Sequence, residues 1–166
     1  MSSESPASLT PVRFRSACAR FPTGITVVTV FDAGGAPHGM TANSFTSVSL
    51  DPPLVLVCID LKAKLVARFH HGTVFGINVL GQHQQELSVR FARKGADRFA
   101  GVDWTRGESG APLLPGALAT LECVVTQVVD AGDHRIVIGA VRAATWRDGR
   151  PLVYFNSGYA ALEASG

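Results

Sequence analysis

The chain has 166 residues, 46% of them hydrophobic and 17% charged, a balance that excludes a disordered chain and fits one folded domain. Fifteen lysine and arginine residues against thirteen aspartate and glutamate residues leave a net charge of +2, too balanced to indicate nucleic-acid binding. No apolar run approaches the ~18 residues of a membrane-spanning helix, so we expect no membrane association. A small domain this apolar is expected to bury one face in a homo-oligomer.

The first half of the chain begins with a helical pattern and continues with strand patterns. Thr10-Pro11 is typical of a helix start, and the apolar spacing after it predicts a helix that ends near Phe21. Residues 25–31 are mostly β-branched and predict a strand. A second extended stretch is expected within residues 39–50, and a strand buried on both faces over residues 54–60.

The second half of the chain is dominated by strand patterns joined by tight turns. The predicted elements are a helix over 62–70, a strand over 74–80, an amphipathic helix over 82–94, an irregular loop over 95–116, long strands over 117–130 and 134–147, and a strand over 151–155. Short turns between successive strands favour antiparallel pairing. The fold class is therefore mainly β, a barrel with peripheral short helices rather than a doubly wound sheet.

The cysteines and histidines indicate neither disulfides nor a metal site. Cys18, Cys58 and Cys123 form no CxxC pair, and the last two lie in apolar runs, so we expect free thiols in a reducing cytoplasm. None of the five histidines has a zinc-ligand spacing. The N-terminus lacks the pattern of a signal peptide. We expect a flexible tail over 1–10, a single domain over 11–162 and a short tail over 163–166.

A dense polar segment interrupts this apolar chain. Its hydroxyl and amide side chains are Thr41, Asn43, Ser44, Thr46, Ser47 and Ser49. Such groups can donate to a phosphate or to the polar edge of a planar ring. A solvated strand face with a Ser-rich turn explains the composition equally simply, but the Asp-Pro-Pro ending and the apolar strand after it favour a binding segment. The common nucleotide and hydrolase motifs, GxGxxG, GxxxxGK[ST] and GxSxG, are absent.

A few further residues are candidates on position alone. His134 opens a strand after a Gly-Asp turn, where an imidazole can face a ligand, although a solvent-exposed turn histidine fits the same place. Lys62 and Lys64 follow an apolar strand and either meet a phosphate or start a solvated helix. Arg93 either reaches an anion or complements the helix dipole. Tyr159 either lies beside a ligand or packs a C-terminal tail on the barrel.

Several segments in order resemble one family. They are residues 21–29 (FPTGITVVT), 39–55 (GMTANSFTSVSLDPPLV), 75–80 (FGINVL), 91–94 (FARK), 97–99 (DRF), 132–134 (GDH) and 158–159 (GY). Each is weak alone, but their order and spacing over about residues 14–162 resemble the flavin reductase family of the FMN-binding split barrel. Members of this family are the reductase components of two-component flavin-dependent monooxygenases.

The resemblance implies a fold, a reaction and a set of partners. The fold would be a homodimer of split Greek-key β-barrels with flavin near the subunit interface. The reaction would be hydride transfer from NAD(P)H to FMN or FAD, and the reduced flavin would diffuse to a separate monooxygenase component. Because the two cofactors carry this chemistry, the protein mainly orients and stacks their rings.

The resemblance also implies site residues. Those expected to contact flavin are Thr41, Ala42, Asn43, Ser44, Phe45, Ser47, Val48, Ser49, Cys58, Ile59, Asp60, Lys64, Phe91, Ala92 and Arg93. Backbone N–H groups of residues 41–44 would stabilise the negative charge of the reduced flavin. The residues expected on the nicotinamide side are His134, Ser157, Gly158 and Tyr159, with His134 catalytic only by its position.

One departure from the family pattern and two alternatives stay open. Many relatives carry Ser or Thr where this chain has Lys62-Ala63-Lys64, so either a lysine replaces a hydroxyl there or the phosphate is held mainly from Ser44 and Ser47. A split-barrel oxidase with tightly held FMN, similar to pyridoxamine phosphate oxidases, and a flavin- or haem-binding module without turnover are the alternatives. An oligonucleotide-binding barrel is disfavoured by the low net charge.

Overall fold

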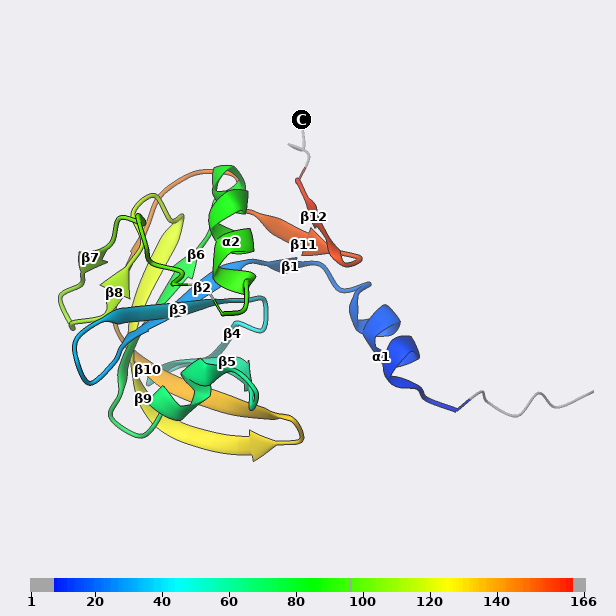
Figure 1. Cartoon of the computed structure of the whole chain (residues 1–166), viewed down its shortest axis with the longest axis horizontal. Helices are drawn as coiled ribbons and strands as arrows, with labels where there is room; N and C mark the ends of the chain where they lie inside the picture. Colours follow the sequence, from blue (N-terminus) through cyan, green and yellow to red (C-terminus); the bar gives the residue numbers. More distant parts are fainter. Residues whose placement is uncertain (1–7, 96, 163–166) are drawn as a thin grey trace, which may run out of the picture.

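One antiparallel sheet of seven strands, in the order β3-β2-β6-β9-β10-β5-β4, forms the body of the protein (Figure 1). The computed structural model describes residues 8–95 and 97–162. The strands of this sheet are β2 (Thr26–Phe31), β3 (Pro37–Ala42), β4 (Thr46–Leu50), β5 (Pro53–Asp60), β6 (Val74–Val79), β9 (Ala119–Ala131) and β10 (His134–Trp146). In the long β9–β10 hairpin, the backbone of Gly139 packs closely against Phe75, because an added Cβ would lie 2.6 Å from the Phe75 ring.

The first and last strands of this sheet are neighbours in the sequence. Only residues 43–45 separate β3 from β4, so the sheet has to curl until its two edges meet. We call residues 41–49, where the edges meet, the seam of the barrel. A cis Asp51–Pro52 peptide lies in the turn that follows. The predicted mainly β barrel is thereby confirmed.

The interior of the barrel is apolar. Its largest fully buried side chains include Val28, Val57, Ile59, Phe75, Ile77 and Val125. Phe69 closes one end and meets Phe75 edge-on, with ring centroids 5.6 Å apart. Burial of each such side chain contributes about 1.5–3 kcal/mol, so this core stabilises the curled sheet that carries the seam.

A second layer covers one part of the sheet's outer face. It contains β1 (Thr23–Gly24), η2 (Gln82–Gln84), α2 (Gln85–Ala92), β7 (Thr105–Arg106), β8 (Pro112–Leu113), β11 (Val153–Phe155) and β12 (Gly158–Ala160). Ile25, Val27, Leu80, Phe91, Phe99, Leu114 and Leu152 form a second apolar core beneath it. Asn78 links the layers, because its Nδ2 donates to the Val27 carbonyl at 3.0 Å and its Oδ1 accepts the Leu114 N–H at 2.8 Å.

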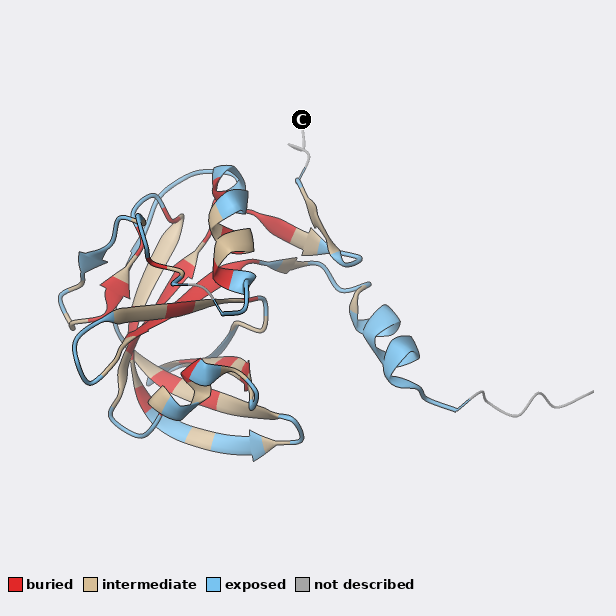
Figure 2. Ribbon diagram, viewed as in Figure 1, coloured by how far each residue is buried: buried red, intermediate tan, exposed pale blue. Residues whose placement is uncertain are grey.

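The N-terminal helix α1 (Pro11–Cys18) stands apart from the barrel, and none of its residues is buried (Figures 1 and 2). The predicted cap is present, since Thr10 Oγ1 accepts the Arg13 N–H at 3.3 Å. The helix is shorter than predicted. Val12 and Phe14 of the helix are 66% and 57% exposed, so the described residues leave its apolar side chains uncovered, and Phe21 after it is 75% exposed.

The prediction that residues 54–60 form a strand buried on both faces is wrong for one face. In β5, Val55, Val57 and Ile59 point into the barrel and are almost fully buried, whereas Leu54, Leu56 and Cys58 alternate with them and are half-buried. The sequence is apolar on both faces, but no layer formed by the described residues covers the outer one. Cys58 is therefore only half-buried, while Cys123 is fully buried as expected.

Other predicted elements differ at their ends. The stretch within 39–50 breaks at residues 43–45, where the chain passes from β3 to β4. The helix expected over 62–70 is a short 3-10 helix, η1 (Lys64–Arg68), and the one over 82–94 begins as η2 and becomes α2. The loop over 95–116 contains the small β7–β8 pair. No helix in the described part of the chain is long and apolar enough to cross a membrane. The tail residues 1–7 and 163–166 lie outside the described residues.

Candidate functional site

The seam joins the polar segment to strand β5. Ser44 Oγ donates to the Cys58 carbonyl at 3.1 Å and accepts the Cys58 N–H at 3.0 Å. On the other side of the break, Thr26 Oγ1 donates to the Ala42 carbonyl at 2.8 Å, and Ala42 and Phe45 pack against the barrel core. The fold therefore fixes the backbone of the polar segment at both ends.

The middle of the seam presents its polar side chains to the outside. Asn43, Thr46 and Ser47 are exposed, and Val48 is a bulge between Ser47 and Ser49 in the pairing of β4 with β5. A bulge at a sheet edge re-aims side chains and leaves backbone groups unpaired. Since β3 and β4 end the order of the sheet, each has an edge without a strand partner among the described residues. Exposed hydroxyls and the two end strands of the sheet thus lie together.

His134 lies on the same outer face, two strands from the seam. It pairs with Asp60 across β10 and β5, and Ile136 pairs with Cys58 next to it. His134 Nδ1 is 2.6 Å from Asp133 Oδ1, and this hydrogen bond holds the pKa of the Asp133 carboxyl below its usual range, with the charges of His134 and Lys62 acting in the same direction. Ile59, also predicted to contact flavin, points into the barrel and is fully buried.

Lys62 and Lys64, which replace the Ser or Thr of many relatives, lie just beyond β5. The turn is closed by Lys62 N–H, which donates to Asp60 Oδ1 at 2.7 Å, and by Leu61 N–H, which donates to the Asp133 carbonyl at 3.0 Å. Lys62 and Lys64 are both exposed, and Lys64 begins η1. Two ammonium groups therefore lie next to a surface rich in hydroxyls, which is a suitable donor set for a phosphate.

A second group of predicted residues lies behind β3. Thr41 Oγ1 donates to the Ser88 carbonyl of α2 at 2.6 Å, and Ser88 Oγ is 2.9 Å from Tyr159 Oη of β12. The chain Thr41–Ser88–Tyr159 ties the seam to the helix and to the C-terminal hairpin. Ser157, with Gly158 beside it, lies in the hairpin turn after Asn156, where positive φ values of 49° and 63° indicate a type I′ turn.

Of the predicted site residues at the end of α2, one is buried and two are exposed. Phe91 is fully buried and meets Phe99 edge-on at 4.9 Å, so its side chain belongs to the core and does not face a ligand. Ala92 and Arg93 are exposed. Arg98 bridges this end to β3, donating from Nη1 to the Gly39 carbonyl at 2.6 Å and from Nε to the Arg93 carbonyl at 2.8 Å.

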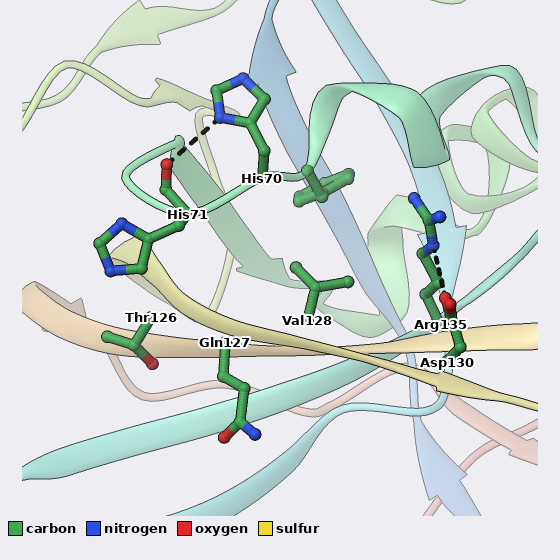
Figure 3. A pocket seen from close by; sticks show the side chains of 8 residues that line it. His70, His71, Thr126, Gln127, Val128, Asp130 and Arg135 are labelled. Atoms are coloured by element: carbon green, nitrogen blue, oxygen red, sulfur yellow. Dashed lines mark hydrogen bonds and ion pairs between the residues drawn. The ribbon is translucent and has the colours of Figure 1, made fainter.

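Two shallow, open pockets in the described part of the chain lie elsewhere. One of them, of about 450 Å³, lies between the segment after η1 and the β9–β10 hairpin (Figure 3). Its lining residues are Phe69, His70, His71, Thr126, Gln127, Val128, Asp130 and Arg135. Arg135 Nε donates to Asp130 Oδ1 at 2.8 Å there, on the face of β10 opposite to His134. None of the predicted site residues lines it, so their surface is open rather than enclosed.

No group of three or more histidine, cysteine, aspartate or glutamate side chains is arranged to hold a metal ion within residues 8–95 and 97–162. The donors that gather at the seam are hydroxyls, backbone N–H groups and ammonium groups. This set fits a planar ring with polar edges and a phosphate tail. The fold and the site define a curled β-barrel with an open polar binding surface along its seam.

We next compared the chain with known proteins. A model described as a flavin reductase like domain matches residues 18–163. The actinorhodin polyketide dimerase of Streptomyces coelicolor is 45% identical over 149 residues, covering 89% of this chain and 84% of that protein. The reductase subunit of a flavin-dependent monooxygenase from Rhodococcus jostii is 38% identical over 157 residues, covering 94% and 80%.

The solved structures agree with the sequence matches. The NADH:FAD oxidoreductase of Streptomyces globisporus, in complex with NAD and FAD fragments, matches with a TM-score of 0.86 at 40% identity and covers 95% of this chain and 98% of that chain. The chain belongs to the flavin reductase family. The split-barrel fold that the sequence resemblance implied is confirmed.

Sequence reasoning missed three residues that organise the site. Asp133 contacts His134, Ser88 links Thr41 to Tyr159, and Arg98 holds Gly39 and Arg93. Asp133 and Arg98 lay within the segments that carried the resemblance, so their signal was present but had no assigned role. Ser88 gave no signal, because a serine inside an amphipathic helix is ordinary.

Proposed function

We propose that this protein is an NADH-dependent flavin reductase that reduces free FMN or FAD and releases the reduced flavin to a monooxygenase component. The observation that carries the proposal is the open seam, with hydroxyls, strand edges and lysines on one surface, in a member of the flavin reductase family. Hydride passes from the nicotinamide to the flavin, and this transfer needs no acid or base from the protein.

The flavin is proposed to lie along the seam. Backbone N–H groups of residues 41–44 and the side chains of Asn43 and Ser47 supply donors to the polar edge of the ring. Two sets of donors are available to the phosphate: exposed Ser47, which pairs with Val55 near the start of β5, and exposed Lys62 and Lys64 beyond the other end of that strand. Because Thr41 Oγ1 already donates to Ser88, the contribution of Thr41 to ring binding comes from its backbone.

The nicotinamide is proposed to approach from the side of His134. This residue shares the outer face of β5 and β10 with Cys58 and Asp60. The hairpin turn with Ser157 is exposed, and Tyr159 supports the seam through Ser88. The relative from Streptomyces globisporus is named as NADH-dependent, which favours NADH over NADPH for this chain.

The functional form is proposed to be a homodimer. Leu54 and Leu56 of β5 and Ile136 and Ile138 of β10 form an apolar outer face that no segment within residues 8–95 and 97–162 covers, and Val48 beside them is 46% exposed. A sheet with two apolar faces needs a second layer. A second copy placed on this face would adjoin the seam and enclose a ligand that the single chain leaves open.

The proposed partner is the oxygenase component of a two-component system. The relative from Rhodococcus jostii is named as a monooxygenase reductase subunit. An open site suits a reductase that has to release its product. A bare flavin-binding module would bind flavin without consuming NADH, and an oxidase would keep its flavin through purification.

One assay decides between these functions. The purified protein is inspected for bound flavin and then incubated with NADH, with and without FMN, FAD or riboflavin, while NADH absorbance is recorded. We expect NADH oxidation that depends on added flavin and exceeds the rate with NADPH. Flavin that copurifies and oxidises a substrate without added flavin would indicate the oxidase. Binding of flavin without NADH oxidation would refute the proposed reductase.

A further inference from the structure

The contact between Asp133 and His134 fixes the chemical state of one ring nitrogen. His134 Nδ1 lies 2.6 Å from Asp133 Oδ1. The hydrogen bond from His134 holds the pKa of Asp133 below its usual range, so the carboxyl is ionised at neutral pH. An ionised carboxylate only accepts hydrogen bonds, and therefore Nδ1 has to carry the proton. In the neutral ring, Nε2 is then left with a lone pair.

The backbone beneath this pair is held on both sides. Leu61 N–H donates to the Asp133 carbonyl at 3.0 Å, and the turn that contains Leu61 is closed by Lys62 N–H on Asp60 Oδ1. His134 itself is paired with Asp60 in the sheet. The Asp133 side chain is 89% exposed, so the anchored turns fix its backbone and the contact with Nδ1 orients its carboxylate.

We propose that Asp133 is a positioning residue that holds His134 with Nδ1 protonated and Nε2 available as an acceptor on the outer face of the sheet. The group that this acceptor fits is a primary carboxamide, which donates an N–H, as the nicotinamide of NADH does. This role rests on the proposed function. Without Asp133 the ring is free to rotate and to protonate Nε2 instead, and a protonated Nε2 cannot accept from the carboxamide.

The neighbouring charges do not substitute for Asp133. Asp60 on β5 is engaged by the Lys62 N–H, and Asp130 on β9 is engaged by Arg135. Arg135 follows His134 directly and so points to the opposite face of β10. Asp130→Asn is therefore a matched control, because it removes a carboxylate from the same hairpin without touching the His134 ring.

The test uses the full-length protein with ¹⁵N-labelled histidine and records the ring nitrogen signals by NMR, with His134→Ala to assign them. We expect wild type and Asp130→Asn to show the neutral His134 ring protonated at Nδ1. Asp133→Ala should lose that state and raise KM for NADH about tenfold with a smaller change in kcat, the scale of one hydrogen bond. Asp133→Asn keeps an acceptor oxygen and should recover most of the affinity.

The possible outcomes distinguish the positioning role of Asp133 from the proposed reductase function. An unchanged His134 ring signal in Asp133→Ala, or an unchanged KM for NADH, would overturn the positioning role while reductase activity stands. Equal impairment in Asp133→Ala and Asp133→Asn with an unaltered ring state would also overturn it, because only the turn would then be affected. Absence of flavin-dependent NADH oxidation in wild type would refute the proposed function instead.

Discussion

Ser44 and Cys58 are joined through a single hydroxyl, which donates to the Cys58 carbonyl and accepts the Cys58 N–H. These two hydrogen bonds link the three-residue break between β3 and β4 to the strand that carries Asp60. The barrel is closed at this point by a side chain rather than by a ladder of backbone hydrogen bonds. Stability and ligand binding therefore meet in one residue.

Replacing Ser44 with Ala should destabilise the protein by about 1–3 kcal/mol, because both Cys58 backbone groups lose their partner. Flavin affinity should fall as well, since the seam is no longer fixed to β5. Urea unfolding and flavin titration measure the two effects. Ser16→Ala, on the exposed helix α1, is the control and should change neither quantity. Equal unfolding midpoints for the two variants would contradict the role of Ser44.

Replacing Asn43 or Ser47 with Ala should weaken flavin binding by about 1–2 kcal/mol with little change in folding stability. Both side chains are exposed, so their loss leaves no buried group unsatisfied within the chain. Fluorescence titration of FMN measures the dissociation constant. His71→Ala, an exposed side chain at the pocket away from the seam, should bind FMN like wild type. Wild-type affinity in both seam variants would make the segment a solvated strand.

Replacing Ile138 with Asp should convert the proposed dimer to a monomer. Ile138 pairs with Leu56 on the uncovered outer face, and a carboxylate buried there without a partner is strongly unfavourable. Light scattering at micromolar concentration reports the mass. Ala33→Asp adds the same charge in the exposed turn after β2 and should remain dimeric. A wild-type protein that is monomeric yet fully active would count against the dimer itself.

The three thiols should differ sharply in reactivity. Burial, with the charge of Glu122 adding to it, raises the pKa of Cys123 to about 12, so almost no thiolate exists near neutral pH. Cys18 is exposed and should react first with iodoacetamide. Mass spectrometry of the native and unfolded protein locates the labels. Labelling of native Cys123 as fast as Cys18 would show that the core opens readily.

Acid stability should depend on Asp32. The hydrogen bond from His38 at 2.9 Å, followed by the Ala36 N–H, holds its pKa below the usual value of 3.8. Because the folded pKa is the lower one, the stabilisation is fully present above about pH 3.8 and is lost as the pH falls through the folded value. Asp32→Asn should unfold at a lower temperature at neutral pH and show a flatter decline in acid, measured by melting curves. Parallel curves for both proteins would exclude this contribution.

Local sequence patterns predicted most strands because their causes are local. Thr10-Pro11 starts α1, and a Gly-Asp turn separates the two long strands before His134, as expected. The segment over 41–49 was also singled out correctly as polar, and the structure collects it with Cys58, Asp60 and His134 at one surface.

The remaining features depend on distant parts of the chain. Nothing local shows that β5 has one uncovered face, because Leu56 is as apolar as Val57. The burial of Phe91 follows from α2 packing on β2 and β3, and the Ser88–Tyr159 contact joins residues 71 positions apart. Sequence reasoning placed Phe91 and Tyr159 near the site, gave no role to Ser88, and could not tell which side chains faced a ligand and which supported the fold.

The order of strands in the main sheet has a kinetic consequence. The connection between its two end strands, β3 and β4, spans only residues 43–45, whereas β5 pairs with β10 only after residues 61–133 have been looped out. Closing a short loop costs little chain entropy, and a long one costs more and slows the search. The β2–β3 and β9–β10 hairpins are therefore placed to form early, and the β5–β10 pairing, which brings Asp60 beside His134, is the late event of folding. The surface proposed to bind the two cofactors is then assembled last, by the step that completes the barrel.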